Sequence, residues 1–133
     1  MFFEVHLRNK IMSLIEKVEQ MVGYLTVEDW ESFYPFFTED LSYKVGAHET
    51  VTGAKAAAEF LAGFYQIVKP ANHVVHGAWE LDGGVVIIEM DANYMRIADG
   101  KPITVPCCDV YRFEGDLIKD WRVYPDVANV YAE

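Results

Sequence analysis

The first half of the chain carries apolar residues at helical spacing. Over residues 7–25, apolar positions recur every three to four residues while Glu and Lys occupy the opposite face, which predicts a first helix. A second, shorter helix is predicted over 26–37 with Thr26 as its cap. An Ala-rich segment, 52–67, predicts a third helix capped by Thr52.

The second half changes to the pattern of β-strands. Its apolar stretches are separated by the turn signals LDGG, ADGK and EGD, which favour tight connections between neighbouring strands. The predicted strands, including a short one among the helices, are 40–45, 72–81, 84–97, 102–113 and 117–124. We therefore expect an α+β fold in which the three N-terminal-half helices pack on a strongly curved, mostly antiparallel sheet, forming a cone with an internal pocket.

Alternation along each predicted strand decides which side chains face that pocket. On 72–81 the more core-like set places His73 and Trp79 inward and His76 outward. On 84–97 the inner set is apolar and the outer set carries Glu89 and Asp91. The residues expected to bind an apolar substrate are Val45, Met90, Ala92, Cys107, Tyr111, Trp121 and Val123.

One predicted strand places a carboxylate in the face that it should bury. In ITVPCCDVYRF, every second residue from Ile103 onward is apolar or aromatic except Asp109. An acid at such a position needs a partner, or desolvation raises its pKa. A raised pKa suits a general acid or a hydrogen-bond donor near neutral pH. The alternatives are a bulge at Pro106 that turns Asp109 away, or a purely structural acid.

Three further polar residues are candidates for catalysis. His73 is expected to act as an acid or base if it meets Asp109, which would fix its tautomer; otherwise it is a structural histidine. Tyr43 and Tyr94 are candidate donors to a substrate oxygen, or core residues with satisfied hydroxyls. Cys107 is interpreted as a small core residue because nothing in the sequence predicts a lowered thiol pKa.

Composition narrows the class of ligand. The 133 residues are 52% hydrophobic and 14% aromatic, enough to fill a core and too apolar for a disordered chain. A net charge of −10 argues against nucleic acid and, more weakly, against anionic membranes and strongly anionic substrates. An uncharged or weakly polar ligand fits better, and no metal-ligand spacing or cofactor motif is predicted.

Cysteine usage and hydropathy indicate the compartment. The two cysteines, Cys107 and Cys108, are adjacent on a predicted strand and point to opposite faces, so no disulfide is expected between them. A reducing, cytoplasmic setting is the simplest interpretation. No apolar run approaches 18 residues, and the N-terminus lacks the features of a signal peptide.

The segments EDWESFYPFFTEDLSY, VTGAKAAAEFLAGF and CDVYRFEGDLIKDWRVYPD resemble the SnoaL-like group within the nuclear transport factor two-like superfamily of cone-shaped, cystatin-like α+β proteins. The resemblance covers nearly the whole chain and implies a single SnoaL-like domain over 1–133. That superfamily includes ketosteroid isomerases, scytalone dehydratase, limonene epoxide hydrolase, polyketide cyclases and non-catalytic association modules. The resemblance also implies a homodimer.

Carried over by position, the resemblance gives parts of several mechanisms. Asp109 takes the place of the ketosteroid isomerase aspartic acid that is held protonated, but that family's base falls at Val45 and its oxyanion tyrosine near Met21. His73 resembles the histidine of scytalone dehydratase, whose second histidine falls near Tyr94. The Asp–Arg–Asp set of limonene epoxide hydrolase falls on Met90, Ala92 and Val123, which disfavours that chemistry.

The sequence thus predicts cofactor-independent acid–base proton transfer on a hydrophobic, oxygenated, cyclic substrate. Isomerisation, dehydration and cyclisation all fit, with Asp109 and His73 as acid and base and Tyr43 or Tyr94 holding a carbonyl oxygen. The alternatives are a non-catalytic module for ligand binding or dimerisation and, less favoured, an epoxide hydrolase with a rearranged triad.

Overall fold

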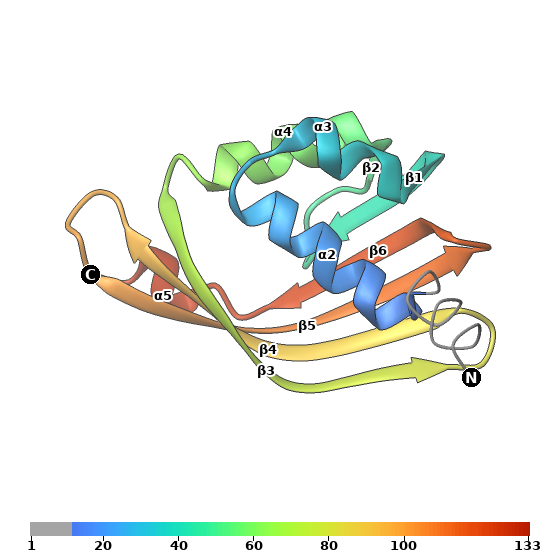
Figure 1. The fold of residues 1–133 in the computed structure, drawn as a ribbon. Coiled ribbons are helices and arrows are strands. Elements are labelled where there is room, and N and C mark those ends of the chain that lie inside the picture. Colours follow the sequence, from blue (N-terminus) through green and yellow to red (C-terminus); the bar gives the residue numbers. More distant parts are fainter. Residues whose placement is uncertain (1–11) are drawn as a thin grey trace, which may run out of the picture.

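The computed structural model describes residues 12–133 as helices packed on one mixed sheet (Figure 1). The helical elements are α2 (Leu14–Thr26), α3 (Trp30–Phe33), the 3₁₀ turn η1 (Tyr34–Phe36), α4 (Ala54–Phe64) and α5 (Ala128–Tyr131). The strands are β1 (Phe37–Val45), β2 (Val51–Thr52), β3 (Val68–Leu81), β4 (Val85–Arg96), β5 (Pro102–Glu114) and β6 (Leu117–Pro125). The α+β class predicted from the sequence is confirmed.

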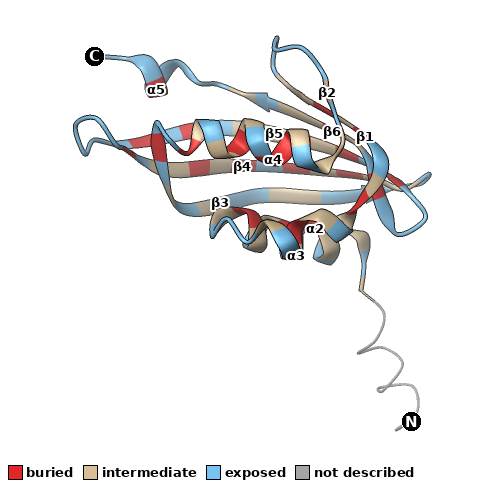
Figure 2. Cartoon of the chain, turned by 90° about the horizontal axis from the view of Figure 1, so that it is seen from above, coloured by how far each residue is buried: buried red, intermediate tan, exposed pale blue. Residues whose placement is uncertain are grey.

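The sheet has six strands in the order β2-β1-β6-β5-β4-β3. All neighbouring pairs are antiparallel except β1 and β6, which run parallel. The prediction of a strongly curved sheet was wrong. The sheet is open, with β2 and β3 at its two edges. The long strands bend toward the helices at one end only (Figure 1). Helices α2, α3 and α4 cover one face, and α5 lies against the far end of the same face (Figure 2).

The first predicted helix is α2, which begins two residues into the described part of the chain. Ser13 caps it: the Ser13 hydroxyl accepts from the backbone N–H of Glu16, and the Glu16 carboxylate accepts from the backbone N–H of Ser13. Its buried face packs Val18, Met21 and Leu25 against the sheet, as the spacing predicts. The part of the prediction before residue 12 lies outside the described residues.

The second and third predicted helices are shorter than expected, and their caps differ. Asp29, not Thr26, caps α3, because its carboxylate accepts from the backbone N–H of Ser32, while Thr26 ends α2. Thr52 is not a cap either. It belongs to β2 and pairs with Ser42 of β1, and α4 begins after Gly53 without a side-chain cap. A two-residue strand carries too little periodicity to be seen in the sequence.

The core lies between the helices and the inner face of the sheet (Figure 2). On β4 and β5 the inner residues alternate as predicted, and the whole inner row of β5 from Ile103 to Phe113 is buried or half-buried. No bulge occurs at Pro106, which pairs with Asp91 in an unbroken register. Asp109 therefore points inward.

The face prediction for β3 is half right. His73 pairs with the inner Ala92, as predicted, but a register shift between Val75 and Gly77 reverses the alternation beyond it. Trp79 consequently pairs with the outer Ile87 and is 49% exposed. Its ring lies over Gly77, where an added Cβ would stand 2.3 Å from the indole.

No helix within residues 12–133 combines the length and apolar composition needed to cross a membrane.

Candidate functional site

A cavity of about 360 Å³ lies between the inner face of the sheet and the helices. Ten of the eleven residues predicted to form the site line it: Tyr43, Val45, His73, Met90, Ala92, Tyr94, Cys107, Asp109, Trp121 and Val123. The eleventh, Tyr111, is fully buried behind the wall and contacts Asp109. The structure therefore gathers the predicted residues around one space.

Asp109 is the most deeply placed acid of this cavity, with 5% of its surface exposed. Its Oδ1 accepts from Cys107 Sγ at 2.9 Å, and its Oδ2 accepts from the Tyr111 hydroxyl at 3.0 Å and from Trp121 Nε1 at 3.2 Å. Cys107 and Tyr111 are its neighbours on the same face of β5. Trp121 lies on the adjacent strand β6, where it is opposite Tyr111. Strand alternation and register thus assemble the three donors.

The charge around Asp109 favours its protonated form. Burial raises the pKa of this carboxyl, and the three hydrogen bonds lower it by less. Of the described residues that line the cavity, none is Lys or Arg. A neutral acid is therefore the form that this environment favours.

The hydrogen bonds also indicate which oxygen has room for the proton. Trp121 Nε1 and the Tyr111 hydroxyl both donate to Oδ2 and fill its two acceptor positions, whereas Oδ1 accepts a single bond, from Cys107. The proton of a neutral Asp109 then belongs on Oδ1, the oxygen on the side of Cys107, which lines the cavity. The indole is held for this purpose by stacking on Tyr111, with ring centroids 5.3 Å apart.

Two phenols face the cavity with free hydroxyls. Tyr43 is 2% exposed, and neither it nor Tyr94 forms a side-chain hydrogen bond within residues 12–133. Thr38 Oγ1 is the one fully buried side-chain polar atom of that range without a partner, so both phenol oxygens keep contact with open space. Burial raises the pKa of each phenol, which keeps them as neutral donors.

His73 lies in another part of the same cavity, and the expected contact with Asp109 does not form. No hydrogen bond joins the two residues in the described chain. In the register, His73 is opposite Ala92 and Ala92 is opposite Val105, four residues before Asp109 on β5. At 3.3 Å per residue the two positions are about 13 Å apart along the strands.

Burial lowers the pKa of His73, so its imidazole is neutral at neutral pH. The same side chain borders a second hollow of about 280 Å³ between α2 and β3, where Val22 is also shared with the main cavity. His73 thus stands at one boundary of the main cavity. A ligand that filled the cavity would contact both His73 and Asp109 without a direct bond between them.

Cys107 is placed as a small wall residue. Burial raises the pKa of its thiol far above the usual range, and Asp109 beside it acts in the same direction. The thiol therefore donates to Asp109 and is a poor nucleophile at neutral pH. Within the described residues, no group of three or more His, Cys, Asp or Glu side chains is arranged to hold a metal ion.

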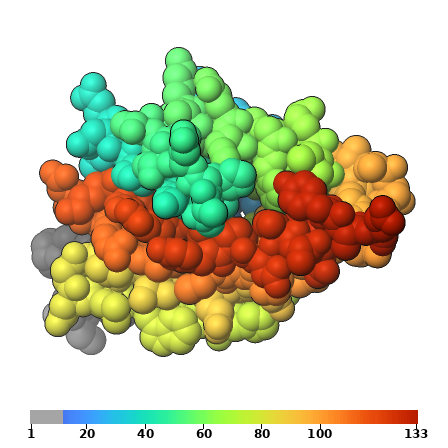
Figure 3. Space-filling model, turned by 180° about the vertical axis from the view of Figure 1, so that it is seen from behind, coloured from blue at the N-terminus to red at the C-terminus, as the bar shows by residue number. Residues whose placement is uncertain are grey.

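The sequence interpretation missed one side of the cavity. Phe60 and Phe64 of α4 line it, as do Val127 and Tyr131 near the C-terminus. The four-residue spacing of the two phenylalanines was a usable signal, because it places both on one helical face. The space-filling view shows the C-terminal segment beside α4 on this side of the molecule (Figure 3).

Comparison with known proteins agrees with this architecture. The sequence model of the SnoaL-like domain family matches residues 18–121. A search of curated proteins finds no match.

Solved structures share the fold at low sequence identity. A protein of Catenulispora acidiphila with a ketosteroid isomerase-like fold, crystallised with trimethylamine, is 19% identical over 86% of this chain and 88% of that one, with a TM-score of 0.76. An LEH-like epoxide hydrolase of M. tuberculosis is 22% identical over 89% and 86%, with a TM-score of 0.71. A candidate SnoaL-like polyketide cyclase of Jannaschia is 15% identical over 88% of both chains, with a TM-score of 0.76.

Proposed function

The chain belongs to the SnoaL-like domain family, and from this premise we propose that it is an enzyme for cofactor-independent proton transfer on a hydrophobic, oxygenated, cyclic small molecule. Its reaction is an isomerisation, a dehydration or a cyclisation. An isomerisation or an aldol-type cyclisation moves a proton from carbon to another position of the substrate, whereas a dehydration takes a proton from carbon while the departing hydroxyl gains a proton and leaves as water. In each reaction charge develops on an oxygen.

Asp109 supplies the acid. A neutral carboxyl with its proton on Oδ1 donates to a substrate oxygen in the cavity, and the bonds from Tyr111 and Trp121 hold the group in place. Ketosteroid isomerases use a neutral aspartic acid in an apolar site in the same way. Tyr43 or Tyr94 adds a second donor to the same oxygen, because both hydroxyls are neutral and have no hydrogen-bond partner in the described part of the chain.

His73 supplies the base. Its imidazole is neutral and can accept a proton from substrate carbon at neutral pH. Since His73 and Asp109 occupy separate positions along the cavity, the substrate must be extended enough to reach both. The apolar walls, which include Val45, Met90 and Trp121, favour a molecule with few polar groups.

One observation carries the proposal: a buried acid, with no cationic partner among residues 12–133, points into an apolar cavity lined by two phenols that have no side-chain hydrogen bond within the same range. A structural aspartate gains stability by being ionised beside a cation or backbone donors. Asp109 has instead three neutral side-chain donors, whose bonds lower its pKa by less than burial raises it, so the proton is retained through burial.

Asp109→Asn tests the assignment with a panel of enones, hydroxy-ketones and open-chain polyketide analogues. The amide oxygen can accept from Tyr111 and Trp121 while its NH₂ takes the place of the Oδ1 proton, so the fold is kept but proton donation is lost. Turnover should fall about 10²- to 10⁴-fold. The matched control is Asp82→Asn in the exposed turn between β3 and β4, which should leave turnover unchanged. Full activity of Asp109→Asn removes the assignment.

A non-catalytic ligand-binding module is the second candidate. The position of the ketosteroid isomerase base is held here by Val45, and the Catenulispora neighbour was crystallised with a small molecule, trimethylamine. Tight binding of several panel members without turnover of any would favour this function. An epoxide hydrolase is disfavoured because Met90, Ala92 and Val123 cannot activate water; it would require incorporation of labelled water into a diol.

We further propose a homodimer formed through the outer face of the sheet. Trp79, Leu81 and Tyr124 are exposed large residues on that face, beside the His76–Asp91 pair. Light scattering after gel filtration should give twice the 15.2 kDa chain mass, and Trp79→Ser should shift the equilibrium toward monomer. A 15 kDa species alone at micromolar concentration contradicts the dimer.

A further inference from the structure

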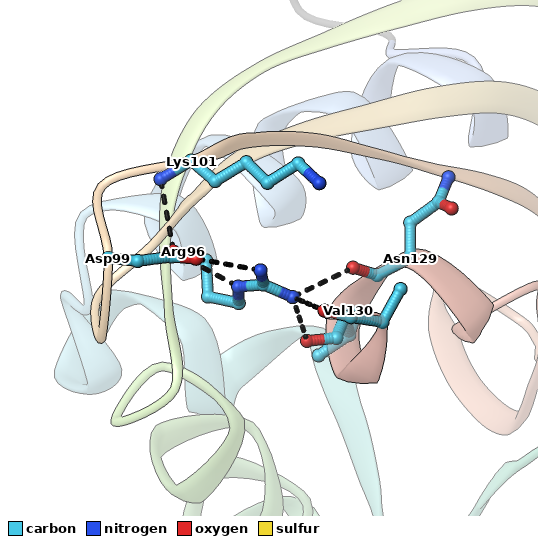
Figure 4. A network of polar contacts seen from close by, with 6 residues as sticks. Arg96, Asp99, Lys101, Asn129 and Val130 are labelled. Carbon is cyan, nitrogen blue, oxygen red and sulfur yellow. Dashed lines mark hydrogen bonds and ion pairs between the residues drawn. The ribbon is translucent and has the colours of Figure 1, made fainter.

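Arg96 is the centre of a polar network (Figure 4), and none of the residues labelled there lines the cavity. It is the last residue of β4 and only 9% exposed. One side of its guanidinium contacts Asp99 in the β4–β5 turn, with Nε donating to Oδ1 at 3.0 Å and Nη2 donating to Oδ2 at 2.7 Å. Asp99 Oδ1 also accepts from the backbone N–H of Lys101, which fixes the carboxylate in the turn.

The other side of the guanidinium contacts the C-terminal segment. Nη1 donates to the backbone carbonyls of Asn129 at 3.5 Å and Val130 at 3.3 Å, and also to that of Ala132 (Figure 4). These are carbonyls at the end of α5, which have no partner inside a helix of four residues.

Helix α5 depends on such contacts for its position. Four residues are too few for a helix to be stable alone in water. Besides Arg96, its anchors are the buried Val130, 1% exposed, and a bond from Asn129 Nδ2 to the carbonyl of Thr104 at 3.2 Å. Val127 and Tyr131, at the two ends of this segment, line the cavity next to α4.

We infer that Arg96 is a positioning residue that sets the width of the cavity mouth by holding α5 against the β4–β5 turn. Arg96 itself does not line the cavity. Its effect reaches a ligand through Val127 and Tyr131, so it selects which molecules enter and how fast they leave. The effect on ligand entry and release rests on the proposed function, whereas the role of Arg96 in positioning α5 does not.

The experiment uses Cys107 as a reporter of access to the cavity. Cys107 lines the cavity and is opposite Met90 in the register, six residues before Arg96 on β4. Its thiol reacts slowly because burial raises its pKa, so labelling uses excess N-ethylmaleimide at pH 9 in a Cys108→Ser background. Any opening that admits water and reagent should increase this rate. Arg96→Gln should label roughly tenfold faster than the parent, because charge-assisted bonds to α5 are lost. Hydrogen exchange at residues 128–132 should accelerate in parallel. Arg96→Lys, which keeps the charge but not the planar fork, should fall between the two.

Two controls separate positioning from general loosening. Arg122→Gln removes an exposed arginine and its 3.4 Å contact with Asp120 on β6, and should change neither labelling nor exchange at 128–132. Asp99→Asn leaves the bonds from Arg96 to α5 but frees the guanidinium from the turn, so it should give a smaller change in the same direction. It also serves if Arg96→Gln fails to fold.

The outcomes are distinct. Parent-like labelling and exchange in Arg96→Gln and Asp99→Asn would overturn the inference, as would an equal acceleration in Arg122→Gln. On an accepted substrate, Arg96→Gln should change KM more than kcat, the opposite of Asp109→Asn. If no panel compound binds or reacts, the proposed function fails, while the labelling result still decides the role of Arg96.

Discussion

Asp109 and Asp99 are aspartates of one small protein placed in opposite surroundings. Asp109 lies on β5 among neutral donors from β5 and β6, and burial raises its pKa. Asp99 lies in the β4–β5 turn, where the bond from the Arg96 guanidinium lowers its pKa to about 2. The first environment keeps a proton within reach of the cavity, and the second keeps a fixed charge.

The two surroundings show what distinguishes an aspartic acid suited to proton transfer from an aspartate that holds structure. Both carboxylates accept three hydrogen bonds, so the number of donors does not distinguish them. A cation is present at Asp99 and absent at Asp109 among the described residues, and Asp99 is half-exposed while Asp109 is buried. Charge and burial together therefore decide the role.

The largest effect is expected from placing a cation beside Asp109, which gives its carboxyl the kind of partner that Asp99 has. Val123 is opposite Asp109 in the register, so Val123→Lys places an ammonium group beside the carboxylate. The pKa of Asp109 should then fall from its raised position, since a nearby opposite charge favours the ionised form. Turnover should fall as in Asp109→Asn. Carbon NMR titration of the carboxyl measures the shift.

Val123→Met is the matched control, because it has similar length without charge. It should leave the pKa of Asp109 raised and change only the fit of the ligand. An unchanged titration in the lysine variant would show that Asp109 is not governed by local charge.

Removing one neutral donor should give a smaller effect. Tyr111→Phe deletes the hydroxyl that donates to Asp109 Oδ2, and should destabilise the fold by about 1–3 kcal/mol because a buried acceptor loses a partner. Tyr43→Phe removes a hydroxyl that has no bond within residues 12–133 and should have less effect on the free energy of unfolding. Urea unfolding of both variants measures the difference, and equal losses contradict it.

The smallest expected effect is a difference in sign between two pH dependences. Folded Asp109 retains its proton above the unfolded pKa of about 3.9, so its contribution to stability falls as pH rises toward its raised pKa. Folded Asp99 releases its proton earlier, so its contribution is complete above about pH 4 and is lost as pH falls toward about 2.

Urea unfolding from pH 2 to pH 8 should therefore separate the two Asn variants. Relative to wild type, Asp109→Asn should gain stability as pH rises above about 4, whereas Asp99→Asn should gain relative stability as pH falls below about 4. Parallel curves for the two variants would contradict the assigned surroundings.

The sequence was sufficient for the parts of the site that follow from strand alternation. The inward position of Asp109, its neighbours Cys107 and Tyr111, and the apolar walls all follow from a period of two on β4 and β5. What periodicity cannot give is register between strands. The separation of His73 from Asp109 depends on pairing along three strands, and the outward turn of Trp79 depends on a bulge.

The role of Arg96 was also beyond the sequence pattern. In YMRIADG it resembles an ordinary charged residue before a turn, and α5 is too short to produce a helical period. Both become visible only when the β4–β5 turn and the C-terminal segment are placed side by side (Figure 4). Contacts between short segments that are far apart in the sequence cannot be predicted from the spacing of apolar residues within either segment.

The hydrogen bonds from Arg96 to the described C-terminal segment all go to main-chain oxygens. The position of α5 therefore depends little on the side chains of α5, apart from the buried Val130 and the hydrogen bond from Asn129. Tyr131 can be exchanged for a larger, smaller or more polar residue while the backbone keeps its place. The rim of this cavity is therefore the region where selection, natural or in the laboratory, can alter ligand preference with the least disturbance of folding.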